Sequence, residues 1–424
     1  MILELVWVAP FILLLGSIAV FPLTHKHWWE KNFLFVSLGL GLLVVCRYIF
    51  LLKNSEILLD TALEYFSFIV LIGSLYIVSG GIHINVKGEA TPVVNTVFLF
   101  IGAVLANILG TTGASMVMIR PWIRMNKYRM TAFHIVFFIF LISNIGGGLT
   151  PIGDPPLFLG YLKGVPFFWV WQHVLPIWIL AVSLLLVVFF LFDSNNFRKA
   201  PKEIRDKETS HGEEWKFLGA HNIFFLLMIL AAVFVNHPRF LREGIMMLAA
   251  FLSYKKTSKQ IHDSNDFNFG PIKEVAILFA GIFATMIPAL QWLEHYSSEL
   301  GIKTPGHFFW GSGILSSVLD NAPTYLNFLS ACSGLFTNAG NAIGEHGQIA
   351  MLLADHPNYI RAISVGSVFF GAVTYIGNGP NFLVKSIADQ SKVNTPSFFG
   401  YFFNYSFPIL IPTFFLIWWL FFKG

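Results

Sequence analysis

The sequence predicts an all-α polytopic membrane protein built from two inverted-topology repeats. Three observations support this fold class. The 424 residues are 55% hydrophobic and only 12% charged, with a mean hydropathy of +0.67, whereas soluble domains average about 25% charged residues. Several apolar stretches approach the ~20 residues that a helix needs to cross a bilayer. Two further stretches, one in each half, repeat one another and contain too much glycine and proline for continuous helices.

The continuous spans are expected at about residues 2–22, 32–52, 61–81, 167–192, 217–236, 240–254, 272–293 and 398–422. The first carries Glu4 and is followed by its basic residues, which favours a retained span with an outside N-terminus over a cleaved signal. Cys46 and Cys332 lie in apolar surroundings, which favours buried thiols over a disulfide or a metal site.

Two segments are expected to be re-entrant hairpins. Residues 92–122 and 305–333 are each too long for one crossing and too short for two, and each has a polar middle, at Asn107–Ser115 and Asp320–Thr324. With hairpins at both places, nineteen of the 27 Lys and Arg residues fall on one side and eight on the other. The first side is therefore predicted to be cytoplasmic, and both chain ends are predicted to lie outside.

Two broken helices are expected at residues 130–163 and 358–392. GLTPIGDPPLF, from Gly148 to Phe158, superimposes without a gap on AVTYIGNGPNF, from Ala372 to Phe382. Asp154 then falls on Asn378. Bare backbone at bilayer depth is tolerated only where it is buried in protein or lines a cavity. Interrupted spans at corresponding places in two halves therefore point to the binding site of a secondary transporter.

These segments divide the chain into three parts. Residues 1–192 form the first repeat, with hairpin 92–122 and broken helix 130–163. Residues 217–424 form the second, with hairpin 305–333 and broken helix 358–392. Residues 193–216 are hydrophilic and are expected to be a mobile cytoplasmic linker.

Oxygen-bearing side chains and glycines gather in the hairpin tips and the breaks. The ion- or substrate-binding candidates are Asn107, Thr111, Thr112, Asn144, Thr150, Gly153, Asp154, Asp320, Asn321, Thr324, Thr374, Gly377, Asn378 and Asn381. Hard oxygen donors with two carboxylates suit a small hard cation, so Asp154 and Asp320 are candidate Na⁺ ligands. Either aspartate could instead cap the helix that follows it. Lys385 is either a charge partner of these carboxylates or a lysine that snorkels to the surface.

The stretch NIGGGLTPIGDPP, from Asn144 to Pro156, resembles the glycine-rich motif of the ion transporter superfamily. That superfamily holds the NhaD-type sodium:proton antiporters, the arsenite permeases, the mammalian P protein and the citrate-metal-proton symporters. The inverted halves and the stretch AILFAGIFATMIPAL, from Ala276 to Leu290, extend the resemblance over nearly the whole chain. Within the superfamily the chain is most similar to a compact group labelled sodium:proton antiporter or citrate transporter.

The resemblance implies a homodimer, a scaffold built from the early spans of each half, and elevator-like movement of the hairpins and broken helices. The sequence departs from the family in one place. The arsenite and P protein branch often has Asn after GDPP, where this chain has Leu157, while Asn381 occupies the equivalent position of the second half.

Two transport functions remain open from the sequence. Asp154 and Asp320 could exchange H⁺ for Na⁺ in a sodium:proton antiporter, which is the expected function, because carboxylates among neutral oxygens suit competition between the two ions. The alternative is a cation-coupled symporter of a di- or tricarboxylate such as citrate. An enzyme is not expected, because the chain has no HExxH or GxSxG motif.

The partners follow from the same reasoning. A net charge of +4 spread over the loops indicates no nucleic acid. The expected partners are a small inorganic cation, an organic carboxylate in the symport alternative, and the lipid bilayer of a cell (inner) membrane. No cofactor is expected beyond Na⁺ and H⁺ as transported or coupling ions.

Overall fold

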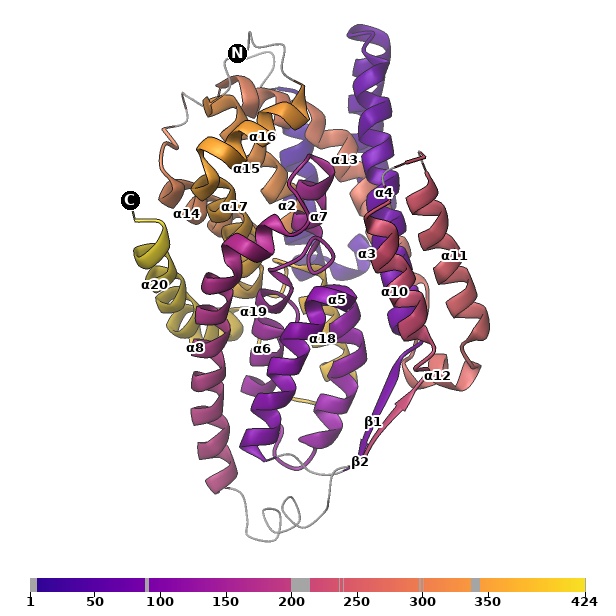
Figure 1. The fold of residues 1–424 in the computed structure, drawn as a ribbon, viewed down its shortest axis with the longest axis vertical. Coiled ribbons are helices and arrows are strands. Elements are labelled where there is room, and N and C mark those ends of the chain that lie inside the picture. Colours follow the sequence, from indigo (N-terminus) through magenta and orange to yellow (C-terminus); the bar gives the residue numbers. More distant parts are fainter. Residues whose placement is uncertain are drawn as a thin grey trace.

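The computed structural model of the protein describes residues 6–87, 91–199, 214–235, 237–238, 240–296, 299, 301–336 and 344–423. The described part is helical nearly throughout, which confirms the all-α polytopic fold class (Figure 1). Within it, six helices are long and apolar enough to cross a membrane. The first half contains α2 (Ala9–Thr24), α3 (Lys26–Cys46), η1 (Arg47–Leu51), α4 (Ser55–Gly80), β1 (His83–Lys87), α5 (Pro92–Met125), α6 (Ala132–Leu141), η2 (Ile145–Gly147), α7 (Pro155–Leu162) and α8 (Trp169–Lys199).

The second half begins with a strand and continues as helices. Its elements are β2 (Glu214–Leu218), α10 (Asn222–Val233), α11 (Leu241–Lys256), α12 (Lys259–Ser264), α13 (Gly270–Tyr296), α14 (Pro305–Ser316), α15 (Asn321–Phe336), α16 (Glu345–Asp355), α17 (Pro357–Phe369), η4 (Phe370–Val373), α18 (Gly379–Gln390), α19 (Phe398–Tyr401), η5 (Phe402–Leu410) and α20 (Ile411–Phe421).

A small sheet was not expected. Strand β1 pairs with β2 in antiparallel register, from His83 opposite Leu218 to Lys87 opposite Glu214. Apolar residues alternate with polar ones along β1 and over the first four residues of β2, a pattern that suits a pleated ribbon. The end of the predicted mobile linker is therefore a strand, and the span expected at 217–236 is the shorter helix α10. Residues 200–213 of that linker lie outside the described part of the chain.

Both predicted hairpin segments reverse direction. In α5 the reversal occurs at Gly110, which has a φ of +75°, a conformation that glycine adopts without strain. Asn95 and Asn126 exchange side-chain hydrogen bonds of 2.7 and 3.0 Å, although a straight helix would hold them about 46 Å apart. In the second segment, the rings of Phe308 and Phe328 lie 6.1 Å apart. Figure 1 places α5 in the lower half of the molecule and α14 and α15 in the upper half.

Helices α6 and α17 form the centre of the core. Nearly every side chain of α6 from Phe133 to Leu141 is buried, as is nearly every one of α17 from Ile360 to Phe369. This burial on nearly all sides shows that other parts of the protein enclose both helices. Each helix is followed by its break, so the irregular backbone lies in the interior.

A buried charge cluster joins the base of the first hairpin to α6 and α8. Arg129 donates to both carboxylate oxygens of Asp193, and Asn95 donates to the same carboxylate at 2.8 Å. The Nε2 atom of His134 lies 3.1 Å from it. A buried carboxylate is stable only when its charge is paired and hydrogen-bonded. The sequence did not reveal this cluster, because Asp193 looks there like the first residue of a solvated linker.

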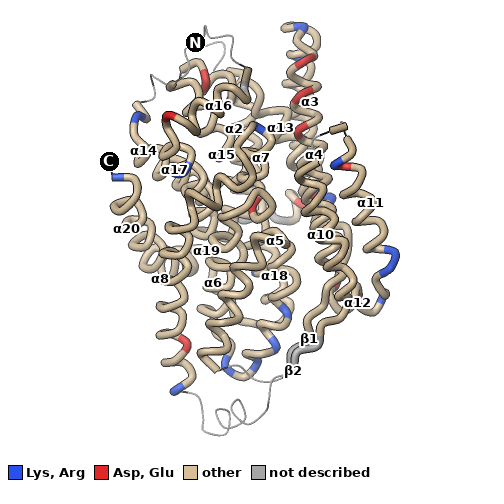
Figure 2. The backbone as a smooth tube through the Cα atoms, viewed as in Figure 1, with Lys and Arg blue, Asp and Glu red and all other residues tan. Residues whose placement is uncertain are grey.

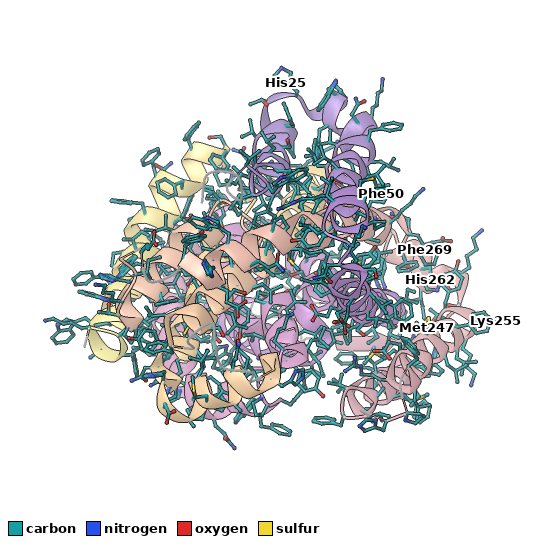
Figure 3. The ribbon with its side chains drawn as sticks, turned by 90° about the horizontal axis from the view of Figure 1, so that it is seen from above. His25, Phe50, Met247, Lys255, His262 and Phe269 are labelled. Carbon is teal, nitrogen blue, oxygen red and sulfur yellow. The ribbon has the colours of Figure 1, made fainter. Side chains whose placement is uncertain are left out.

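Charged residues gather toward the two ends of the molecule. In Figure 2, Lys and Arg lie at the lower end near the ends of α5, α18 and α8, while several Asp and Glu lie in the upper part. Figure 3 shows Met247 and Lys255 of α11 at one edge of the molecule, with His262 and Phe269 beside them. Met247 and Phe269 are about half exposed, at 47% and 46%, so this edge is open to lipid or to a partner.

Candidate functional site

In the first break, between α6 and α7, the backbone folds back so that Gly153 packs against Gly147. Helix α6 ends at Leu141, a 3-10 turn follows at Ile145–Gly147, and α7 begins at Pro155. A Cβ at Gly153 would lie 2.1 Å from the carbonyl oxygen of Gly147, so only glycine allows this approach. The hydroxyl of Thr150 accepts from the Gly153 N–H at 3.0 Å and donates at 2.6 Å to the carbonyl of Asn107 in the first hairpin. The break is thereby fastened to the hairpin tip.

The second break repeats these contacts. A Cβ at Gly377 would lie 2.7 Å from the carbonyl oxygen of Gly371. The hydroxyl of Thr374 accepts from the Gly377 N–H at 3.1 Å and donates at 2.5 Å to the carbonyl of Ser317 in the second hairpin segment. Thr374 and Gly377 align with Thr150 and Gly153. The aligned threonine hydroxyls therefore make corresponding pairs of hydrogen bonds in the two halves.

The hairpin tips meet the breaks through backbone groups. The amide of Asn107 donates at 2.7 Å to the Gly146 carbonyl and accepts at 3.0 Å from the Leu149 N–H. The Thr111 N–H donates at 2.8 Å to the Gly153 carbonyl. A cavity of about 30 Å³ lies beside Thr111, Thr112 and Gly153. That volume can hold one water molecule.

Asp154 lies at the centre of the site and is fully buried. Its Oδ1 accepts from the Thr111 hydroxyl at 2.9 Å and from the Asn378 amide at 3.1 Å, and its Oδ2 accepts from the Asn321 amide at 2.9 Å. The three donors come from the first hairpin, the second break and the start of α15. Although Asp154 is the N-cap residue of α7, its side chain makes no capping hydrogen bond. The capping alternative for Asp154 is therefore wrong.

Three asparagines join the two breaks next to this carboxylate. The amide nitrogen of Asn144 donates to Asn381 at 2.7 Å, and its oxygen accepts from Asn378 at 3.2 Å. Asn381 in turn donates to the carbonyls of Gly371 and Thr374 at 2.8 and 2.9 Å. All three side chains are buried. Neutral amides thus connect the halves at the depth of Asp154.

The remaining candidates lie farther from this centre. Asp320 is partly exposed, and its carboxylate accepts at 3.1 Å from the Ala322 N–H at the start of α15, as a capping residue does. The Thr324 hydroxyl donates to the Asp320 carbonyl at 3.0 Å. The ammonium of Lys385 pairs with Asp389 at 2.6 Å, one helical turn away. The structure therefore does not bring Lys385 to Asp154 or Asp320.

One residue of the site was missed by the sequence. The Ser316 hydroxyl lies 2.6 Å from the oxygen of the Asn321 amide and also 2.6 Å from the Ser367 carbonyl. It therefore orients the amide that donates to Asp154. Ser316 looks like an ordinary small residue of an apolar helix, and it aligns with Ala106 in the first half, so neither composition nor the repeat singled it out.

The arrangement suits a proton or a small cation. Every hydrogen-bond partner that the structure gives Asp154 is neutral, so nothing in that set compensates its charge. A buried carboxylate of this kind is stabilised either by a proton or by a cation. Hydroxyl and amide groups can turn an oxygen toward an ion as readily as they now present a hydrogen to Asp154.

Comparison with known protein families gives a match over nearly the whole chain. The model of the family described as "Putative citrate transport" matches residues 1–422. No curated protein matches the chain.

Proposed function

The chain belongs to this citrate transport family of membrane transporters, and we propose that it is a secondary active transporter that exchanges Na⁺ for H⁺. The proposed binding site is formed by the two breaks and the two hairpin tips. Asp154 is its proton- and cation-binding group, with Thr111, Asn321 and Asn378 as its neutral partners.

One observation carries this proposal: Asp154 is fully buried and is surrounded by neutral donors from three other segments. Such a carboxylate can hold a proton or a cation, and each disfavours the other because their charges repel. That competition at one group couples the movement of Na⁺ to the opposite movement of H⁺. The neighbouring cavity of about 30 Å³ has room for an ion, whereas pockets for organic ligands usually measure about 300–1,000 Å³.

The inverted-repeat organisation is part of the proposal. The matching bonds of Thr150 and Thr374, and the matching close approaches at Gly153 and Gly377, support two repeats at residues 1–192 and 217–424. Transporters of this architecture place the substrate near the bilayer midplane, between the repeats. The elevator movement and the homodimer are proposed on the resemblance described above. The inner-membrane location with outside termini is proposed on the apolar spans and the distribution of Lys and Arg.

Cation-coupled symport of a citrate-type carboxylate is the second candidate, and the description of the family favours it. In that case the same oxygens would hold the coupling cation. The carboxylate groups of the substrate would contact the N–H groups of the hairpin tips and the half-helices. The hairpin tips would have to separate to admit an organic anion.

Transport by the purified protein in liposomes tests the choice. A pH-sensitive dye inside the liposomes reports proton movement when Na⁺ is added outside, and labelled citrate uptake is measured in parallel. We expect Na⁺ alone to drive proton movement, with no response in empty liposomes. Citrate accumulation that requires Na⁺, with proton movement only in the presence of citrate, would replace antiport by symport.

A further inference from the structure

A second cavity, separate from Asp154, lies between α4, α13, α15 and α16. It measures about 330 Å³, about ten times the volume of the cavity beside Thr111. More than half of its lining residues are polar. They include Asp60, Glu64, Lys163, Glu294 and Ser330.

Two helices connect this cavity with the site. Helix α7 follows Asp154 and is capped by Lys163, and α15 begins at Asn321 and continues past Ser330. With a rise of 1.5 Å per residue, Lys163 lies about 13 Å along α7 from Asp154, and Ser330 lies about 13 Å along α15 from Asn321. The helices lie side by side, since a Cβ at Gly160 would approach the Tyr325 hydroxyl to 2.4 Å. Lys163 lies on the side of the protein that the distribution of Lys and Arg predicts to be outside the membrane.

The lining is negatively charged. It contains the carboxylates of Asp60, Glu64 and Glu294 against a single ammonium, that of Lys163. Lys163 bridges Glu64 at 2.8 Å, so the lining keeps two net negative charges. Figure 2 shows acidic residues in this upper part of the molecule. A cleft whose walls carry one sign of charge in low-dielectric surroundings focuses the field and concentrates ions of the opposite sign.

We propose that this cavity is an access vestibule that concentrates monovalent inorganic cations in front of the Asp154 site and disfavours free carboxylate anions. The inference rests on the proposed function in one respect, namely that the site beneath the vestibule takes a cation. The negative charge of the vestibule favours cations over anions before either kind of ion reaches the binding residues. Asp60 and Glu294 are its selectivity residues.

Thiol labelling tests the electrostatics without any transport. Ser330→Cys, in a background with Cys46→Ser and Cys332→Ala, places one thiol in the cavity wall of the detergent-solubilised protein. The ratio of its reaction rates with cationic and anionic methanethiosulfonate reagents, divided by that ratio for a free thiol, measures the local potential. We expect a normalised ratio of about ten at low ionic strength. It should fall toward one in high salt, because screening shortens the reach of the charges.

Charge-neutralising variants identify the source of the potential. Asp60→Asn combined with Glu294→Gln should bring the normalised ratio close to one. Glu56→Gln is the matched control, because Glu56 is exposed on the same helix one turn before Asp60 and does not line this cavity. It should leave the ratio unchanged. A normalised ratio near one in the protein with both carboxylates, or an equal fall of the ratio in Glu56→Gln, would overturn the proposed vestibule.

Transport then connects the vestibule to the site. In liposomes at low ionic strength, Asp60→Asn with Glu294→Gln should raise the apparent KM for Na⁺ several-fold and leave kcat unchanged, because the charges act on arrival and not at Asp154. An unchanged KM would contradict the role in cation supply. If the labelling ratio is high but Na⁺ drives no proton movement, the proposed antiport fails and the vestibule stands. If the ratio is near one while antiport is observed, only the vestibule fails.

Discussion

Replacing Asp154 by asparagine separates the charge of the site from its hydrogen bonds. The carboxylate now accepts three hydrogen bonds from neutral donors, and hydrogen bonds to charged groups contribute about 1.5–3 kcal/mol each. Asparagine keeps one acceptor oxygen and introduces a donor. With its oxygen in the Oδ1 position it retains the bonds from Thr111 and Asn378, and its nitrogen then faces the Asn321 amide.

A rotation of the Asn321 amide can remove that conflict. The turned amide presents its oxygen to residue 154 and its nitrogen to the Ser316 hydroxyl, which still has the Ser367 carbonyl as an acceptor. At most one hydrogen bond is lost, so the free energy of unfolding should fall by about 1 kcal/mol or less. Asp154→Leu offers no such rearrangement. It leaves the Thr111 hydroxyl and the Asn321 N–H groups without their acceptor at about 1–3 kcal/mol each, and it should therefore be poorly folded.

The assay is proton release from the detergent-solubilised protein when Na⁺ is added in weakly buffered solution. The unmodified protein should release protons with Na⁺ alone, and Asp154→Asn should release none while it remains monodisperse on size-exclusion chromatography. Asp154→Asn combined with Asn321→Asp moves the carboxylate across the 2.9 Å contact and should restore part of the release. Normal Na⁺-dependent release from a folded Asp154→Asn protein would refute the role of Asp154.

The remaining predictions concern the breaks, the charge cluster and the topology. Thr150→Val and Thr374→Val should each lower the free energy of unfolding by a similar amount, about 1–3 kcal/mol. Replacement of either threonine by serine keeps the hydroxyl and should preserve the stability. A clear difference in thermal unfolding between the two valine variants would argue against equivalent repeats. Gly153→Ala should prevent folding or transport because its Cβ meets the Gly147 carbonyl at 2.1 Å, whereas Gly379→Ala, with nothing within 4 Å, should have little effect on either measurement. Arg129→Met should destabilise the protein by about 3–5 kcal/mol, because it leaves the Asp193 charge buried and uncompensated, and unchanged thermal stability would contradict the pairing. Single cysteines at Lys87 and Lys127 should both react with an impermeant reagent only from the cytoplasm, and opposite-side labelling would remove the re-entrant hairpin.

The breaks and the reversals could be predicted because their causes are local. Gly146 to Gly148, with Pro151 and Pro155, excludes a continuous helix whatever packs around it. The same holds for the length of 92–122, which fits neither one span nor two. The short sheet was missed because β1 and β2 are five residues each and are brought together only by the packing of the two halves.

The centre of the site could not be chosen from the sequence. Asp154 and Asp320 look alike there, since each precedes a proline in the first turn of a helix, Asp154 directly and Asp320 by three residues. Packing distinguishes them, because Asp154 faces Thr111, Asn321 and Asn378 from distant segments, while Asp320 bonds to the nearby N–H of Ala322. Lys385 illustrates the same limit. Its position two turns after the break allowed contact with either carboxylate. In the structure its ammonium pairs with Asp389 on the same helix instead.

The difference between the repeats at Asp154 and Asn378 has a physical reason. These two residues occupy aligned positions, and the structure brings their side chains to 3.1 Å. Two ionised aspartates about 4 Å apart would repel by about 4 kcal/mol at an effective dielectric constant of 20. Asparagine replaces that repulsion by a hydrogen bond and leaves a single charge at the point where the halves meet. On the proposed antiport, the contact between these two aligned residues therefore offers one carboxylate, that of Asp154, to a proton or a monovalent cation.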